Sequence, residues 1–390
     1  MARSLTGRTA HISRKLPAVP DLVAIDLPAG PGFVAALQSA WGDGDAVLPV
    51  DQRLSASARA ALLDQLRPGR VAGSDGQQRR PGGLPVEDGD ALVMATSGTT
   101  GEAKGVILTH AAVRASALAT SARLGVDPDR HRWLACLPLN HVGGLAVVTR
   151  GLLTGTPVTV IPRFDRDEVL AAAGPNVLVS LVATALQRVG AEHFHTVVLG
   201  GSAPPSELPP NVVTTYGLTE TGSGVVYDGV PLAGVDVAVD PMSKEIRLRG
   251  PMLMRAYRDG TPALDPEGWF ATGDAGWFGA DGRLHVDGRL REVIITGGEN
   301  VWPAAVEAAL RSHPGVADVA VAGRPDPEWG EQVVAWVVPT PGTSPPALDE
   351  LRAAVAERVA PYAAPRRLVL VRALPRTAIG KVRRDRLPDA

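Results

Sequence analysis

Hydrophobic positions follow a regular pattern from about residue 90 onward. The apolar run at 91–95 ends in a Ser/Thr/Gly loop, as a buried parallel strand would, and Thr109 then caps a predicted helix at 111–124. Strands that alternate with helices indicate parallel sheets covered on both faces. The remaining apolar runs predict strands at 133–137, 158–161, 177–179 and 197–199, with helices at 166–173 and 183–189 between them.

The pattern changes twice after residue 200. Short strands separated by Asp/Gly turns predict a more antiparallel region, at 235–239, 245–248 and 282–286. Near residue 290 a βαβ-like pattern begins, with helices at 304–311 and 348–359 and strands at 316–321, 332–338 and 367–371. By contrast, the polar, Gly/Pro-rich segment 67–83 is expected to be an exposed loop.

These patterns predict an α/β protein of two domains, which suits a chain of 390 residues. Over residues 1–289 we expect a large N-terminal domain of layered α/β sheets with a β-rich subdomain. Over residues 290–390 we expect a small, mobile α+β domain.

Composition narrows the class of protein. The chain has 39 basic and 41 acidic residues, so its net charge of −2 argues against a nucleic-acid partner and against a membrane surface. No apolar run approaches the length of a transmembrane helix, and the N-terminus lacks a signal-peptide core, so we expect a cytoplasmic protein without membrane insertion. Cys136 is the single cysteine and is expected to be a small buried side chain.

Residues 96–105, Thr-Ser-Gly-Thr-Thr-Gly-Glu-Ala-Lys-Gly, carry the strongest chemical signal. Glycines allow close backbone approach, hydroxyl groups donate hydrogen bonds and Lys104 adds a compact charge, as in a loop that binds a polyphosphate. The spacing is not that of a Walker A loop, and a plain Ser/Thr/Gly turn is the alternative interpretation. Lysine is otherwise scarce, because only Lys15, Lys104, Lys244 and Lys381 stand among the 39 basic residues. Eight basic residues against one acidic residue over 366–386 indicate a solvated tail or a lid over phosphates.

The loop at 97–105 closely resembles the phosphate loop of the adenylate-forming enzymes, which include acyl-CoA synthetases, adenylation domains of peptide synthetases and luciferases. Six further segments resemble that family's motifs, in the family's order, so the resemblance covers about residues 90 to 386. They are Pro138–Leu145, Gly200–Pro204, Thr215–Thr221, Thr272–Asp274, Asp287–Asn300 and Pro375–Lys381.

The resemblance implies a role for each matching residue. Thr219 is expected to donate to the α-phosphate, Glu220 to hold Mg²⁺, and His141 to lie near the reacting carboxylate. Lys381 is expected to close the site as the catalytic lysine. For Glu220 a helix-start carboxylate, and for His141 a core histidine, remain the plain alternatives. The residues that the resemblance places around ATP or AMP are Thr96, Ser97, Gly98, Thr99, Thr100, Gly101, Lys104, Gly200, Gly201, Ser202, Tyr216, Gly217, Asp274 and Arg289.

Within that nucleotide site, the resemblance implies that Tyr216 faces adenine and that Asp274 and Arg289 bind ribose. It places the hinge between the domains at Arg291, where family members more often carry aspartate, lysine or serine. Gly297 and Gly298 are expected to face the site after the small domain rotates for the second half-reaction, although a β-turn before a helix explains them equally well.

Two departures from the family pattern indicate which carboxylic acid is the substrate. Only 96 residues precede Ser97, and the connection at 221–235 is unusually short. Both features resemble the short o-succinylbenzoate–CoA ligases of actinobacterial menaquinone biosynthesis. The glycines at 222 and 224 are expected to leave room for a ring-bearing acid. Another aryl- or acyl-CoA ligase, an adenylation enzyme that loads a carrier protein, and a non-catalytic adenylate sensor remain the alternatives. The expected ligands are ATP, Mg²⁺, CoA and a small carboxylic acid, and a homodimer is a further expectation.

Overall fold

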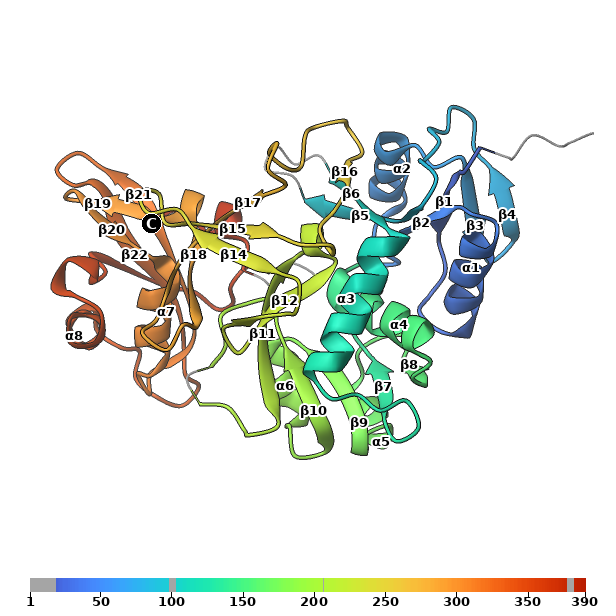
Figure 1. Ribbon diagram of the computed structural model, residues 1–390. Coiled ribbons are helices and arrows are strands. Elements are labelled where there is room, and N and C mark those ends of the chain that lie inside the picture. The colour runs from blue at the N-terminus through green and yellow to red at the C-terminus, as the bar shows by residue number, and fades with distance from the viewer. Residues whose placement is uncertain (1–18, 98–102, 206, 377–381) are drawn as a thin grey trace, which may run out of the picture.

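The computed structural model describes residues 19–97, 103–205, 207–376 and 382–390. Its strands form four sheets, and Figure 1 shows the N-terminal sheet at one end of the molecule and the C-terminal sheet at the other. The predicted α/β class, with a small C-terminal domain, is confirmed. In this part of the chain no helix has both the length and the apolar character needed to cross a membrane.

The first sheet is mixed and has the strand order β16-β6-β5-β2-β1-β3-β4. Strand β16 comes from late in the sequence and pairs with β6, with Tyr257 opposite Val106. The fold thereby brings Tyr257 to the hairpin that flanks the predicted phosphate loop. The strands are β1 (Leu22–Ile25), β2 (Ala46–Pro49), β3 (Arg70–Gly73), β4 (Gly76–Arg79), β5 (Asp90–Ser97), β6 (Ala103–Thr109) and β16 (Ala256–Tyr257), and helices α1 (Pro31–Gly42) and α2 (Ala56–Leu66) pack on this sheet.

The prediction of an exposed loop at 67–83 is wrong. Strands β3 and β4 form an antiparallel hairpin there, with Arg70 opposite Arg79 and Gly76 at a φ of 94° in the turn. Every residue of β4 is exposed, because β4 is the edge strand. A strand with both faces in solvent carries no apolar alternation, so the sequence pattern could not reveal it.

The second sheet has the order β13-β12-β11-β10-β9-β7-β8 and is parallel from β8 to β11. Helices α3 and α4 contribute Val113 and Leu145 to one core shared with the first sheet, and α5 and α6 contribute Val169 and Leu186 to the core on the other face. The prediction of a sheet covered on both faces is therefore confirmed. The elements are β7 (Arg132–Ala135), β8 (Val158–Val160), β9 (Gly174–Leu181), β10 (Phe194–Leu199), β11 (Val212–Leu218), β12 (Ser223–Tyr227), β13 (Val230–Pro231), α3 (His110–Arg123), α4 (Val142–Thr154), α5 (Arg166–Ala171), α6 (Ala183–Val189) and the 3₁₀ turn η1 (Thr219–Thr221).

The third sheet is antiparallel, as predicted for the region after residue 200, and has the order β14-β15-β17-β18. Its inner residues Ile246, Leu248 and Phe270 join the core of the first two sheets. The strands are β14 (Asp236–Val239), β15 (Glu245–Arg249), β17 (Phe270–Phe278) and β18 (Leu284–Arg289), and the short turn η2 (Leu290–Glu292) follows.

The fourth sheet has the order β20-β19-β22-β21, with β23 parallel to β22. Among the described residues, the buried members of the main core of this sheet lie between Ile294 and Ala364, as expected for a small domain that folds around its own centre. The boundary after Arg289 stays a prediction. The elements are β19 (Ile294–Thr296), β20 (Glu299–Val301), β21 (Val316–Asp326), β22 (Gly330–Pro339), β23 (Arg367–Leu370), α7 (Pro303–Arg311), α8 (Leu348–Arg358), η3 (Pro361–Ala363) and η4 (Arg384–Arg386).

Candidate active site

A tight corner at the carboxyl end of β11 carries Thr219 and Glu220. The buried hydroxyl of Thr221 accepts a hydrogen bond from the Leu218 N–H at 2.9 Å and donates to the Ser223 carbonyl oxygen at 2.6 Å. These contacts join the end of β11 to the start of β12, so η1 is held between two paired strands. The corner thus presents Thr219 and Glu220 from a fixed backbone.

Glycines in this corner serve backbone packing. Gly222 ends η1 with a φ of 67°, which favours glycine. A Cβ at Gly217 would collide with the Ser223 carbonyl, and a Cβ at Gly224 would come within 2.9 Å of Thr215. The hypothesis that Gly224 leaves room for a substrate is therefore wrong, because protein atoms already fill the space beside it.

Tyr216, Asp274 and Arg289 form one hydrogen-bonded cluster. The Tyr216 hydroxyl donates to Asp274 Oδ2 at 2.8 Å, and Arg289 Nε lies 2.8 Å from Asp274 Oδ1. The register of β17 and β18 sets Asp274 directly opposite Arg289. Burial, and next the negative charge of Asp274, raise the pKa of Tyr216, so the phenol remains a donor at neutral pH. Three residues predicted for the nucleotide thus lie together although they come from three strands.

The end of β10 lies beside this cluster. Gly200 follows β10, and a Cβ there would come within 2.6 Å of Thr215 Oγ1 on the neighbouring strand β11. Gly201 has a φ of 86°, and both Gly201 and Ser202 are exposed. The predicted Gly-rich strand end is therefore an exposed backbone segment next to Tyr216.

Glu220 is held by a residue that the sequence did not reveal. The Tyr257 hydroxyl donates to Glu220 Oε1 at 2.9 Å, whereas Glu220 Oε2 receives no hydrogen bond from the described residues. Lys104 Nζ lies 5.0 Å from the centre of the Tyr257 ring. Burial, followed by the charge of Glu220, raises the pKa of Tyr257. Tyr257 therefore links the lysine of the predicted phosphate loop to the predicted metal ligand.

The ends of the predicted phosphate loop are fixed by the β5–β6 hairpin. Thr96 pairs with Lys104, and the backbone of Ser97 pairs with Ala103. Gly98, Thr99, Thr100 and Gly101 lie outside the described residues, as does Lys381.

His141 lies at the start of α4 without a side-chain cap, and its Nε2 is 3.2 Å from Asn140 Nδ2. Burial, and then the positive charge of Arg53, lower the pKa of His141, so the ring is neutral at neutral pH. No hydrogen bond joins His141 to the Tyr216 or Glu220 clusters within the part of the chain that the structure describes.

The predicted hinge and second-reaction residues lie on exposed segments. Arg291 is exposed in η2, and Gly297 and Gly298 form the exposed turn between β19 and β20, with φ values of 59° and 83°. A Cβ at Gly297 would come within 2.8 Å of the Trp329 ring. The β-turn interpretation explains both glycines in this orientation of the small domain.

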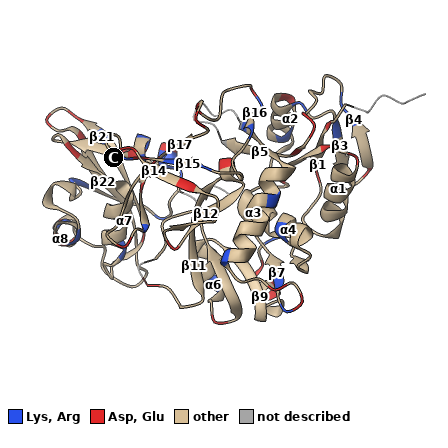
Figure 2. Cartoon of the chain, viewed as in Figure 1, with Lys and Arg blue, Asp and Glu red and all other residues tan. Residues whose placement is uncertain are grey.

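The basic strip at 366–386 is partly neutralised. Arg376 pairs with Asp318 at 2.6 Å, and Arg384 bridges Glu292 at 2.9 Å and Glu307 at 2.6 Å. Figure 2 likewise shows basic and acidic residues interspersed along the chain. These arginines fasten the C-terminal segment to the small domain, so only part of the predicted local charge faces solvent.

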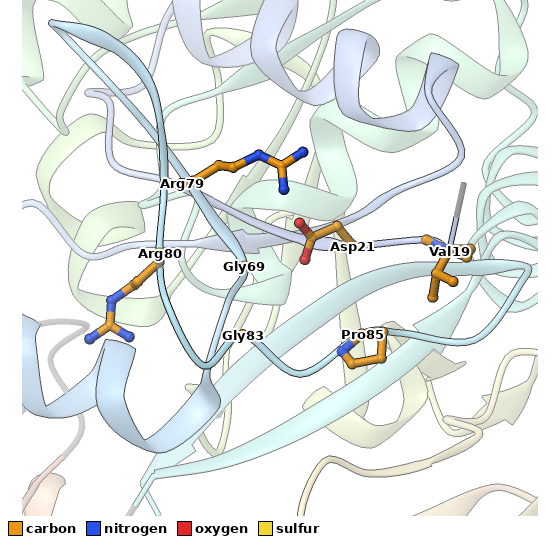
Figure 3. Close-up of a pocket in the computed structure, with 8 residues that line it drawn as sticks. Val19, Asp21, Gly69, Arg79, Arg80, Gly83 and Pro85 are labelled. Carbon is orange, nitrogen blue, oxygen red and sulfur yellow. The ribbon is translucent and has the colours of Figure 1, made fainter. Parts of the chain in front are cut away.

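A pocket of about 240 Å³ lies away from the clusters (Figure 3). It lies between Asp21 and the β4 end of the first sheet, the edge opposite β16 and Tyr257. Arg80, on its rim, turns away from Asp21 and bonds the Leu63 carbonyl on α2. The pocket is separate from the candidate active site.

Cys136 is buried, and burial raises the pKa of its thiol to about 12. A thiol with this pKa is protonated and unreactive at neutral pH. The prediction of a small buried side chain is confirmed.

Comparisons with known proteins identify the class. Residues 71–258 match the family model described as AMP-binding enzyme, and residues 305–381 match the AMP-binding enzyme C-terminal domain. A probable 2-succinylbenzoate–CoA ligase of Mycobacterium tuberculosis is 42% identical over 337 residues, covering 78% of this chain and 85% of the relative. This protein therefore belongs to the family of AMP-binding, adenylate-forming enzymes.

Among solved structures, the chain is similar to those of an o-succinylbenzoate CoA synthetase. The o-succinylbenzoate CoA synthetase of Bacillus subtilis in complex with its acyl-adenylate intermediate superimposes with a TM-score of 0.83 at 29% identity, covering 95% of this chain and 88% of the other. The same enzyme in complex with ATP and magnesium gives a TM-score of 0.82 at 28% identity, covering 95% and 89%.

Proposed function

We propose that this protein is an ATP-dependent ligase that joins o-succinylbenzoate to CoA, as in menaquinone biosynthesis. In the first half-reaction the acid attacks the α-phosphorus of ATP, which gives the acyl-adenylate and releases pyrophosphate. In the second, the CoA thiol attacks the acyl carbon, which gives the thioester and releases AMP. The observation that carries the proposal is the Tyr216–Asp274–Arg289 cluster beside Glu220, in a chain 42% identical to a 2-succinylbenzoate–CoA ligase.

Asp274 can bind the ribose of ATP while keeping its protein partners. Tyr216 donates to one carboxylate oxygen of Asp274 and Arg289 lies against the other, and a carboxylate oxygen can accept more than one hydrogen bond. We expect the two ribose hydroxyls to donate to this carboxylate. Because its hydroxyl donates to Asp274, Tyr216 offers adenine its ring face, and the neighbouring segment Gly200–Ser202 offers backbone groups.

Glu220 fits a magnesium ligand of the kind that works with substrate phosphates. Mg²⁺ prefers oxygen ligands and is often held by one or two carboxylates together with phosphates. Among the described residues Glu220 Oε2 receives no hydrogen bond, so it can face a metal ion, and we expect the ATP phosphates to supply further oxygen ligands. Bound Mg²⁺ would neutralise phosphate charge, while Thr219 donates to the α-phosphate and the 96–104 loop, including Lys104, holds the remaining phosphates.

Domain rotation completes the proposal. The chain divides after residue 289, and the hinge lies at Arg291 in η2. Lys381 serves adenylation, and Gly297 and Gly298 face the site during thioester formation. His141, at the start of α4, lies against the acid; its lowered pKa keeps it an uncharged neighbour of the carboxylate.

A substrate panel tests the function. Purified protein with Mg²⁺, ATP and CoA should turn over o-succinylbenzoate much faster than benzoate or a medium-chain fatty acid. The products should be pyrophosphate, AMP and the CoA thioester, identified by mass. Faster turnover of a simple benzoate or fatty acid would show that o-succinylbenzoate is not the preferred substrate, whereas the assignment to the acid–CoA ligases would stand. Pyrophosphate release without any thioester would favour a carrier-loading enzyme.

Magnesium dependence should respond to both Glu220 and Tyr257. Glu220→Gln removes a charged oxygen ligand at nearly constant size, so adenylation should become slow and require more Mg²⁺. Tyr257→Phe leaves the carboxylate but removes the hydrogen bond that orients it, which is worth roughly 1.5–3 kcal/mol when the partner is charged. We expect a smaller shift of the magnesium titration in the same direction. Pyrophosphate release against Mg²⁺ concentration measures both variants, and an unchanged midpoint in Glu220→Gln would place the metal elsewhere.

A further inference from the structure

Segment 254–258 crosses the candidate active site with little regular structure of its own. Its strand β16 pairs with β6 over only two residues. Just before β16, the Met254 N–H donates to the Glu220 carbonyl oxygen at 2.8 Å. Just after it, the Arg258 N–H donates to the Gly105 carbonyl oxygen at 2.7 Å. The segment therefore joins the corner that presents Glu220 to the β5–β6 hairpin.

Arg255 fastens the start of β16 to the first sheet. Its Nε and Nη2 donate to the two carboxylate oxygens of Asp90 at 2.9 and 2.8 Å, and its Nη1 donates to Glu87 at 2.6 Å. The Asp90 side chain is fully buried at the start of β5, whereas Glu87 is exposed. A guanidinium that meets both oxygens of a carboxylate is fixed in direction as well as in distance. The Asp90–Arg255 pair therefore determines where β16 begins.

Arg258 fastens the other end of β16. Its Nε donates to the Leu66 carbonyl oxygen at 2.9 Å, and its Nη1 donates to the Pro85 carbonyl oxygen at 3.1 Å. Tyr257 thus stands between two anchored arginines. A two-residue strand supplies few ladder hydrogen bonds, so these anchors limit how far Tyr257 can shift.

The buried pair has a geometric consequence at Tyr257. Buried ion pairs contribute little stability compared with apolar residues of similar size, because both charges lose their hydration. The Asp90–Arg255 pair does, however, fix the strand that carries Tyr257 two residues further on. From that strand the Tyr257 hydroxyl reaches Glu220 Oε1, and the ring lies beside Lys104.

On the basis of the proposed function, we propose that Asp90 and Arg255 are positioning residues for the magnesium site. They hold β16 where the Tyr257 hydroxyl meets Oε1 of Glu220, and this contact orients the carboxylate so that Oε2 faces the metal. The effect of the pair on magnesium passes through the Tyr257 hydroxyl.

Binding of labelled ATP, measured by equilibrium dialysis without the acid, tests this inference at equilibrium. The measured quantity is the Mg²⁺ concentration at half-maximal ATP binding, and the melting temperature of each metal-free variant reports on folding. Arg255→Met removes the guanidinium. Arg255→Lys keeps a charge beside buried Asp90 but loses the two-pronged contact, so it stays folded even where methionine would leave the carboxylate unpaired. Each substitution is also combined with Tyr257→Phe, which keeps the ring and removes only the hydroxyl.

We expect Arg255→Met to raise the Mg²⁺ midpoint roughly 10-fold and Arg255→Lys roughly 3-fold, within the range of coupling between neighbouring residues. In the Tyr257→Phe background, the same substitutions should leave the midpoint unchanged, because the hydroxyl through which they act is gone. Arg249→Met is the matched control. It removes an exposed pair with Asp236 on the third sheet and should leave the midpoint at the wild-type value.

An unchanged midpoint in every Arg255 variant that folds overturns the inference, whatever the melting temperatures. A rise of the same size in the Tyr257→Phe background also overturns it, because the pair would then act by stabilising the fold in general. Failure of the proposed function is distinguishable. If Glu220 does not hold magnesium, Glu220→Gln and Tyr257→Phe alone leave the midpoint unchanged, and a different preferred acid does not affect a measurement made without the acid.

Discussion

Lys381→Ala is expected to slow acyl-adenylate formation by roughly 10²–10³-fold, the cost of losing one preorganised contact to transition-state charge, about 2.7–4 kcal/mol. Lysine is scarce in this chain, and Gly380 before Lys381 lets the backbone approach a ligand closely. A compact ammonium can enter between the α-phosphate and the carboxylate, whereas the wider guanidinium of Lys381→Arg should restore little activity. Pyrophosphate release in the absence of CoA measures this step.

The same variant should spare the second half-reaction. Supplied with preformed acyl-adenylate and CoA, Lys381→Ala should form thioester at a near-normal rate if, as we propose, Lys381 acts only in the first orientation of the small domain. Lys244→Ala, on an exposed turn before β15, is the control for loss of a lysine and should behave like the wild-type protein. Equal damage to both half-reactions by Lys381→Ala would show that the small domain is a fixed lid.

Asp274→Asn should weaken ATP binding strongly. The amide keeps the size of the side chain but removes the charge, and its NH₂ group cannot accept from Tyr216 or Arg289. Losing one hydrogen bond to a charged group costs about 1.5–3 kcal/mol, which corresponds to roughly 10- to 150-fold in affinity. The KM for ATP should rise accordingly, and the melting temperature should fall because Asp274 is buried among the groups that bond it.

A matched substitution separates this effect from a general charge effect. Asp236→Asn removes an exposed carboxylate that pairs with Arg249 on the same sheet. Exposed ion pairs contribute little, so both KM and melting temperature should stay near their wild-type values. If Asp274→Asn raised the KM for the acid but not for ATP, the ribose assignment would be wrong.

The sequence predicted much of the fold because most of its elements are half-buried and periodic. Thr109, for example, caps α3 by accepting from the Ala112 N–H, as expected from a threonine directly before an apolar-periodic segment. The β3–β4 hairpin was missed because its second strand is polar on both faces. Strand β16 has two residues, too few for any periodicity, so the approach of Tyr257 to Glu220 follows only from the folded chain.

In the candidate site, too, the sequence predicted individual residues but not the contacts between them. Motifs predicted Tyr216, Asp274 and Arg289 one by one, and the register of β17 and β18 supplied the geometry that joins them.

Two-step chemistry through an acyl-adenylate is the central claim, and a rapid-quench experiment without CoA tests it most directly. Enzyme mixed with o-succinylbenzoate, ATP and Mg²⁺ should release about one equivalent of pyrophosphate per site and hold an adenylate with the mass of o-succinylbenzoyl-AMP. Adding CoA should then consume that adenylate and release AMP and the thioester together. Release of ADP and phosphate, or no pyrophosphate until CoA is present, would contradict the account.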